Sequence, residues 1–180
     1  RRTPPKAQLD LVRAHLAKGK PLAGIRTASH AFDREPAGEH HARWAKFDDE
    51  ILGVDYRNHH GNRPPKDPAT VIQATAAGAE HPILTGVPLD AFEAKSHLYK
   101  NKPVASPVSV LMIGTLAGRD DISEPVAWTN EANGGRVFYT SLGSTDDFAL
   151  PAFQRLLLNG VLWALEKPVP PADPRVVAGK

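Results

Sequence analysis

The sequence contains no cysteine, so disulfide bonds, a thiolate nucleophile and a cysteine-ligated metal are all excluded. Long hydrophobic runs are also missing. The longest apolar stretch, Leu156 to Leu158 followed by Val161 to Leu165, is broken by Asn159 and Gly160 and is too short to cross a bilayer. No segment resembles a signal peptide. We therefore expect no membrane span. The absence of cysteine does not distinguish a reducing from an oxidising cellular compartment.

A dense basic block is absent as well. The 22 Lys and Arg residues nearly balance the 20 Asp and Glu residues, for a formal net charge of +2. This pattern argues against a nucleic-acid partner, because such proteins cluster basic residues on one face. The G-x-S-x-G elbow, the glycine-rich phosphate loops and the H-E-x-x-H motif are not present either. A length of 180 residues is typical of one domain.

The hydrophobic spacing predicts an α/β fold. Apolar residues at helical intervals favour helices from Pro5 to Gly19, from Ala42 to Leu52 and from Phe153 to Leu165. Apolar runs favour strands over 22–26, 71–75, 107–116, 125–129 and 136–142, and Asn133-Gly134-Gly135 predicts a hairpin between the last two. Near-continuous apolar runs suit parallel strands covered on both faces. Residues 55–68 are expected to form a loop.

The segment from Gly24 to Asp33 is the most informative. An apolar run ends there in polar side chains, including Arg26, Thr27, Ser29 and His30. In open α/β sheets ligands bind beyond the carboxyl ends of the strands, so these residues are candidates for a pocket. The alternative is a capping turn without chemistry.

Histidines mark two further candidate loops. His59 and His60 lie in an Asn-, Gly- and Pro-rich loop, and either could act as a base or bind a metal. Pro82 restricts His81 to extended geometry, which can direct its imidazole into a cleft. The alternatives are a solvated loop for the first pair and a simple turn hydrogen bond for His81.

The fourth candidate is the turn from Leu142 to Phe148, which carries Ser144, Asp146 and Asp147. One of the two aspartates could instead serve only as a helix N-cap. Tyr99 and Trp128 could stack on a sugar ring, because aromatic side chains with a polar tip suit carbohydrate faces. Trp44 and Trp163 fall at apolar helical positions and are expected in the core.

Several segments together resemble the trehalose-utilisation, ThuA-like family. They occur in the family's order and cover nearly the whole chain: GKPLAGIRTASHAF, the W-x-x-F-D-x-E-x-L-G pattern from Trp44 to Gly53, HHGN, HPILTGVP, LYK, EPVAWT, GGRVFYTSLG, and the pattern from Phe153 to Leu165. The resemblance implies a flavodoxin-like, class I glutamine amidotransferase-like three-layer sandwich with a mostly parallel sheet. It also implies an opening strand upstream of Arg1. We expect a domain over residues 1–167 and a proline-rich tail over 168–180.

The resemblance further implies a role in bacterial carbohydrate metabolism. Our hypothesis is a hydrolase, lyase or isomerase acting on a keto-sugar or glycoside, with His30, His59 and His81 converging in one cleft as candidate acids or bases. Arg26 would stabilise developing negative charge. Substrate would be bound by Ser29, His60, Tyr99, Trp128, Ser144 and Asp146. The absence of cysteine excludes the usual amidotransferase chemistry.

Two departures from the family weaken any histidine-based metal site. Many members carry His where this chain has Arg26 and Ser144. A divalent metal held by His30, His59 or His81 remains one hypothesis. The main alternative to an enzyme is a non-catalytic sugar-binding or interaction domain on the same scaffold. The expected partner is a small carbohydrate, and the expected location is the bacterial cytoplasm or periplasm.

Overall fold

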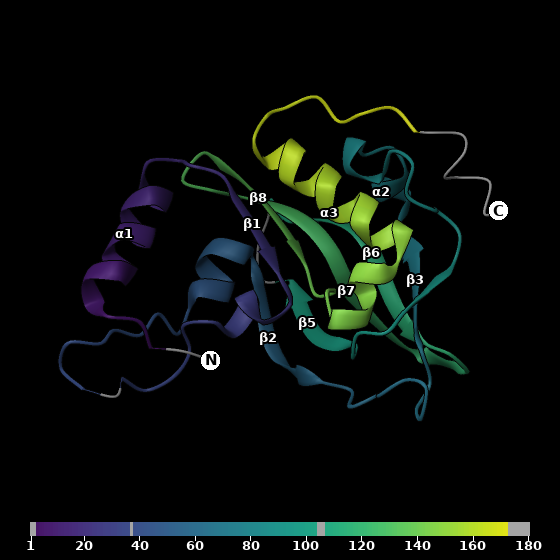
Figure 1. Ribbon diagram of the computed structural model, residues 1–180, viewed down its shortest axis with the longest axis horizontal. Helices are drawn as coiled ribbons and strands as arrows, with labels where there is room; N and C mark the ends of the chain where they lie inside the picture. The colour runs from purple at the N-terminus through teal and green to yellow at the C-terminus, as the bar shows by residue number, and fades with distance from the viewer. Residues whose placement is uncertain (1–2, 37, 104–106, 173–180) are drawn as a thin grey trace.

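The computed structural model describes residues 3–36, 38–103 and 107–172, which form a six-stranded sheet with helices and a smaller ribbon packed against it (Figure 1). The strand order is β1-β8-β7-β6-β3-β4. The bounds are β1 Leu22–Ile25, β3 Thr70–Ala74, β4 Phe92–Ala94, β6 Ser109–Leu116, β7 Arg119–Ala132 and β8 Gly135–Thr140. The second sheet pairs β2 Val54–His59 with β5 Tyr99–Pro103.

The α/β class is confirmed, but the expectation of a mostly parallel sheet is wrong. Among the described strands only β1 and β8 pair in parallel, and every other pairing is antiparallel. The reason lies in the turns. Asn133 and Gly134 both have positive φ and fold β8 back onto β7, as the hairpin signal predicted, and Gly118 turns β6 into β7 in the same way. Apolar runs covered on both faces therefore belong here to antiparallel strands.

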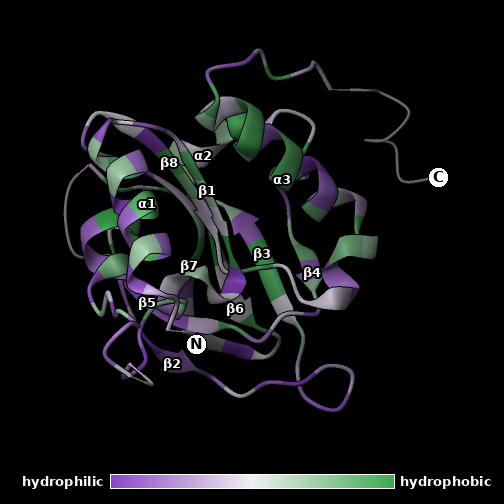
Figure 2. Ribbon diagram, turned by 60° about the vertical axis from the view of Figure 1, so that its left-hand side comes forward, coloured by the Kyte–Doolittle hydropathy of each residue, from purple (hydrophilic) through white to green (hydrophobic). Residues whose placement is uncertain are grey.

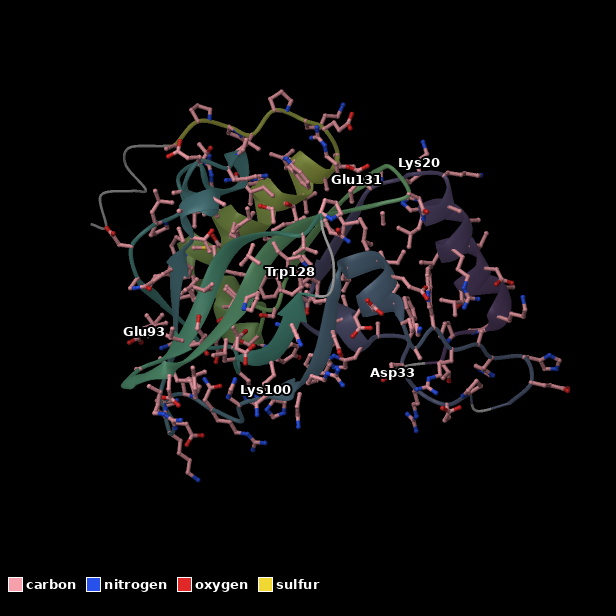
Figure 3. The ribbon with its side chains drawn as sticks, turned by 180° about the vertical axis from the view of Figure 1, so that it is seen from behind. Lys20, Asp33, Glu93, Lys100, Trp128 and Glu131 are labelled. Carbon is pink, nitrogen blue, oxygen red and sulfur yellow. The ribbon has the colours of Figure 1, made fainter. Side chains whose placement is uncertain are left out.

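The two faces of the sheet carry separate cores. On one face lie α2 (Ala76–Ala79), η3 (Pro82–Leu84) and α3 (Pro151–Ala164). On the other lie α1 (Lys6–Ala17), η2 (Asp48–Leu52) and the β2–β5 ribbon, as the opposite views in Figures 1 and 3 show. Neighbouring residues of β8 point to opposite sides, with Phe138 in the first core and Tyr139 in the second. Figure 2 shows hydrophobic residues concentrated in β3, β8 and α3.

The last predicted helix, α3, is confirmed, and Gly160 lies where this helix meets β8. A Cβ on Gly160 would lie 2.2 Å from a ring carbon of Phe138, so the glycine allows α3 to approach β8 closely. Asn159 is fully buried because its amide donates to the carbonyls of Ile83 and Thr85, at 2.8 and 2.9 Å, and joins α3 to the η3 turn.

The expected helix from Ala42 to Leu52 is reduced to η2, a single wide turn of five residues. Gly53 ends it in the left-handed region with φ 77°. The chain then enters β2, where a plain loop was expected over residues 55–68. Pairing with β5 explains the strand: His59 lies opposite Tyr99 in the register. Because this partner is 40 positions away in the sequence, the spacing of apolar residues within residues 55–68 does not reveal the strand.

After α3 the chain runs in extended form to Ala172. The Arg155 guanidinium donates to the carbonyls of Pro170 and Pro171, which holds the first part of the expected tail against α3. The rest of that tail lies outside the described residues. No helix in the described part of the chain is both long enough and apolar enough to cross a membrane.

Candidate functional site

The carboxyl end of β1 leads directly into η1 (Arg26–His30), which lies beside β2 and β5 (Figure 1). Arg26 occupies the left-handed region at φ 50°, an uncommon conformation for a residue other than glycine. Its carbonyl accepts a hydrogen bond from the Tyr139 hydroxyl on the neighbouring strand β8. This fixed turn sets the direction of the side chains that follow.

The Arg26 guanidinium joins three segments of the chain. Its Nη1 donates to the carbonyls of His97 and Ser141, both at 3.0 Å. Its Cζ lies 4.4 Å from the centre of the Tyr99 ring, within the range of a cation–π interaction. Arg26 thereby ties the ends of β1 and β8 to the start of β5.

His30 is held by a hydroxyl and two aromatic rings. Its Nδ1 lies 3.0 Å from the Ser29 hydroxyl, and its ring stacks on Tyr56 at 4.2 Å with 17° between the planes. The Tyr99 ring lies 5.9 Å away. Ser29 itself is buried, with 2% of its surface exposed, and its hydroxyl supports His30.

Two more histidines continue the group along the β2–β5 ribbon. His59 on β2 lies 5.1 Å from the His97 ring and 6.5 Å from the Tyr99 ring, measured between ring centres. Tyr99 also lies 4.8 Å from Tyr56. We call Arg26, His30, Tyr56, His59, His97 and Tyr99 the histidine–tyrosine cluster. Tyr99 is its centre, because every other member except His97 makes a ring contact with it.

The segment Lys95–Leu98, which carries His97, is fixed by side chains from four different places. Asp147 accepts from the Lys95 amide and the Ser96 hydroxyl, and Thr70 donates to the Ser96 carbonyl at 2.7 Å. Arg26 donates to the His97 carbonyl, and Asn62 accepts from the Leu98 amide at 2.9 Å. The backbone around His97 is therefore set before any ligand arrives.

Burial and positive charge shape the electrostatics of the cluster. Burial lowers the pKa of His97 below its ordinary value, and Arg26, His59 and Arg63 lower it further. Asp67 opposes this effect. Burial raises the pKa of the Tyr99 hydroxyl, so this phenol stays protonated at neutral pH. His97 is correspondingly neutral in the same range.

The structure brings His30 and His59 into one cluster around Tyr99 but places His81 elsewhere. The His81 ring lies 5.4 Å from Trp163 on α3, and its Nδ1 accepts a hydrogen bond from the Ile83 amide. The pKa of His81 is lowered by burial and then by Arg136. His81 lies on the α3 face because η3, which it caps, packs against α3. The expected convergence of all three histidines is wrong.

A cavity of about 790 Å³ lies at this second place, lined by His81, by residues 84–90 and by the start of α3. No member of the histidine–tyrosine cluster lies in the wall of this cavity. His81 is the only sequence-predicted site residue in its wall.

Two further candidates have structural partners. His60 Nε2 lies 2.8 Å from a carboxylate oxygen of Glu124 on β7, and both side chains are largely buried. Trp128 is completely buried and its indole N–H donates to the Leu52 carbonyl at 2.8 Å. In Figure 3 Trp128 lies in the interior, over the sheet. The expectation that Trp128 stacks on a sugar is wrong, because its side chain on β7 faces the second core.

The turn before α3 has a structural function that one of the expected alternatives anticipated. Asp147 is fully buried, and besides its bonds to residues 95 and 96 it accepts from the amides of Gly143 and Ser144 at 2.8 and 3.1 Å. Ser144 begins η4 (Thr145–Ala149), and Asp146 is exposed. Through Asp147, the polar turn thus holds the backbone segment that carries His97.

A metal site finds no support in the described part of the chain. Over residues 3–36, 38–103 and 107–172 no three His, Asp or Glu side chains are grouped so that they could hold a metal ion. The candidate ligands His30 and His59 lie in the cluster, whereas His81 lies across the sheet.

Sequence reasoning missed Tyr56 and His97. Tyr56 fell in a stretch expected to be a loop, and His97 precedes the Leu98-Tyr99-Lys100 segment without any motif of its own. The useful signal was the alternation His97, Tyr99, Asn101, in which polar and aromatic side chains recur every second residue, as on one side of a strand.

Comparison with known proteins identifies the family. A family model described as ThuA, trehalose utilisation, matches residues 2–164. A search of the curated proteins finds no match. Among solved structures, the chain is similar to a ThuA-like protein from Bacteroides uniformis, with 21% identity and a TM-score of 0.64, covering 91% of this chain and 65% of that one.

Two other structures agree in fold. A ThuA-like protein from Parabacteroides merdae is 18% identical with a TM-score of 0.60, covering 95% of this chain and 69% of that one. A GH42 β-galactosidase from G. stearothermophilus is 15% identical with a TM-score of 0.57, covering 92% of this chain but 20% of that one. The chain spans about two thirds of the length of the ThuA-like structures. With the family model matching almost the whole sequence, this chain belongs to the ThuA family of trehalose utilisation.

Proposed function

We propose that this protein is a carbohydrate enzyme that removes a proton from the carbon beside the carbonyl group of a keto-sugar. The observation that carries the proposal is the histidine–tyrosine cluster at the carboxyl end of the parallel pair β1–β8. It combines a held imidazole, a cationic guanidinium and a protonated phenol. Membership of the trehalose-utilisation family supports a sugar as the substrate.

His30 is the base in this proposal. Ser29 has one hydroxyl proton, and the carbonyl of Arg26 lies 3.4 Å from its oxygen. When Ser29 donates to that carbonyl, it accepts from Nδ1–H of His30, which leaves Nε2 as the basic nitrogen. Stacking on Tyr56 fixes the plane of the ring. A positioned acid or base of this kind typically contributes about 10²–10⁴-fold to a rate.

Arg26 and Tyr99 stabilise the oxygen on which charge develops. Nε and Nη2 of Arg26 make no hydrogen bond with any described residue, so these donors are available to a substrate oxygen. Tyr99 keeps its proton because burial raises the pKa of its hydroxyl, and it can donate that proton in a hydrogen bond. Donors directed at a developing oxyanion are among the largest contributions to catalysis.

The composition of the cluster favours a keto-sugar over an ordinary glycoside. Its six members are three histidines, two tyrosines and an arginine, whereas most glycosidases work with a pair of carboxylates. Loss of a proton next to the carbonyl gives an enolate. If the deprotonated carbon bears a hydroxyl, this hydroxyl can lose its proton while the former carbonyl carbon and its oxygen each take up one, which is isomerisation. Alternatively, the enolate re-forms the carbonyl as a C=C bond forms next to it and the oxygen substituent one carbon further on is expelled, which breaks the C–O bond. The leaving oxygen then takes up a proton.

The test is exchange of the substrate's own hydrogen. The protein is incubated in D₂O with a 3-keto-glucoside, and NMR follows the loss of the proton beside the carbonyl. We expect His30→Gln to slow exchange by about 10²-fold or more, in line with loss of a general base. The control is His40→Gln, on a side chain with 89% exposure outside the cluster, which should exchange like the wild type.

Two results would contradict the proposal. One is exchange at the wild-type rate in a folded His30→Gln variant, judged by its thermal melt. The other is no exchange with any keto-sugar of a panel, together with calorimetric binding of sugars that is lost in Tyr56→Ala. The second result would favour the sugar-binding domain on the same scaffold.

A further inference from the structure

We propose that His59 and His97, flanked by Arg26 and Arg63, form a subsite for an anionic group, so that the substrate is a sugar bearing a carboxylate or a phosphate. The inference deepens the proposed function and rests on it in one respect: the anion belongs to the same sugar on which His30 acts. Tyr99 joins the two parts, because its ring contacts both His30 and His59.

The His59 ring has a buried nitrogen that no described residue pairs with. Its Nδ1 is buried and has no hydrogen-bond partner among the described residues. Leaving a buried N–H without an acceptor costs more free energy than leaving a buried lone pair without a donor. A neutral imidazole avoids the larger cost by carrying its proton on the other ring nitrogen. The proton is therefore placed on Nε2, which has no hydrogen bond within the described part of the chain and can donate to a ligand.

Hydrogen-bond donors also gather around His97. Its ring lies 5.1 Å from His59, and neither ring nitrogen has a hydrogen-bond partner among the described residues. Arg26 donates to the His97 carbonyl and so brings its charge next to the pair. Histidine N–H groups beside a guanidinium are the donors that recognise carboxylate and phosphate oxygens.

The surroundings of His97 carry more positive than negative charge. Arg26, His59 and Arg63 disfavour a positive charge on His97, and Asp67 favours it. The Asp67 carboxylate is in turn engaged by the Arg63 amide at 2.9 Å. Tyr99, whose ring lies 6.5 Å from that of His59, keeps its proton at neutral pH and adds no negative charge. A bound anion would relieve this excess of positive charge.

The test is an NMR titration of histidine-labelled protein, following the Cε1–H signals of His59 and His97. The probes are gluconate, glucose 6-phosphate and glucose at equal ionic strength. We expect one or both anions to shift the two signals and glucose to leave them in place. A response to gluconate alone identifies a carboxylate, and a response to glucose 6-phosphate alone identifies a phosphate.

Variants separate the subsite from general attraction. His97→Asn should weaken anion binding about tenfold through loss of a charge-assisted hydrogen bond. Arg63→Gln, at an exposed position, should weaken it about threefold at low salt. Arg136→Gln, at the far end of β8, is the matched control and should bind as the wild type does.

The proposal is overturned if glucose shifts the signals as strongly as gluconate, if no probe shifts them, or if Arg63→Gln and Arg136→Gln behave alike. Its failure is distinguishable from that of the proposed function. Anion binding without exchange of a keto-sugar proton would retain the subsite and reject the reaction. Equal exchange on neutral and acidic keto-sugars would retain the reaction and reject the subsite.

Discussion

The close contact between α3 and β8 makes Gly160 the most sensitive position of the first core. A Cβ there would lie 2.2, 2.3 and 2.6 Å from Cε1, Cδ1 and Cζ of Phe138. Carbon atoms normally approach to about 3.5 Å, so the overlap exceeds 1 Å. Phe138 is fully buried and has no room to move aside. Gly160→Ala must therefore push α3 away from the sheet.

The expected magnitude follows from two opposing contributions. Alanine favours a helix over glycine by about 1 kcal/mol. Overpacking a rigid core costs about 1–3 kcal/mol, and the large overlap places this case at the upper end. We expect Gly160→Ala to lower the free energy of unfolding by about 2 kcal/mol. For a chain of this size the melting temperature should fall by about 4–8 °C.

A double-mutant cycle measured by urea unfolding checks the physical reason. Phe138→Leu removes the ring that the new Cβ meets, so Gly160→Ala should cost at least about 1 kcal/mol less in that background. Leu158→Ala, on a half-exposed side chain of the same helix, is the control for changes that do not reach the sheet. An equal cost in both backgrounds, or a gain in stability from Gly160→Ala, would refute the reasoning.

Three further predictions concern buried side chains that stabilise the two faces of the sheet. Asp147→Asn should lower the free energy of unfolding by about 3 kcal/mol, because buried donors lose their acceptor, and urea unfolding at pH 7 measures this. The lowered pKa of His81 means that the unfolded chain binds more protons, so stability falls as pH drops through the ordinary histidine range. His81→Asn keeps an acceptor for the Ile83 amide but should flatten that dependence between pH 7.5 and 5.5, as unfolding at the two pH values would reveal. Trp128→Phe should cost about 1–3 kcal/mol by leaving the Leu52 carbonyl without its donor, while calorimetric sugar binding stays unchanged.

The local parts of the fold could be predicted from the sequence. The spacing of Leu9 and Leu16, the hairpin at Asn133-Gly134 and the apolar face of α3 each depend on residues close together in the chain. The direction of the strands could not be predicted in this way. An apolar run reports only that both faces are covered, and here the coverage comes from α3 on one side and η2 on the other.

The same division applies to the candidate site. Arg26 and His30 follow a short apolar strand, and this local pattern located them correctly at the end of β1. His81 follows a similar pattern of turn residues, yet η3 packs on α3 and takes it to the opposite face. Polar residues after an apolar run therefore identify strand and turn ends, but they do not say which ends share a face.

The remaining half of the cluster depends on contacts between distant segments. The β2–β5 pairing sets His59 opposite Tyr99, and Asp147, Thr70, Arg26 and Asn62 reach the Lys95–Leu98 segment from four other places in the chain. None of these partners is visible from spacing within one element. Because each takes up a backbone or hydroxyl group next to His97, their loss should alter the position of His97 more than that of His30. The cluster thus combines one half fixed by a strand and its turn with another half fixed by tertiary hydrogen bonds.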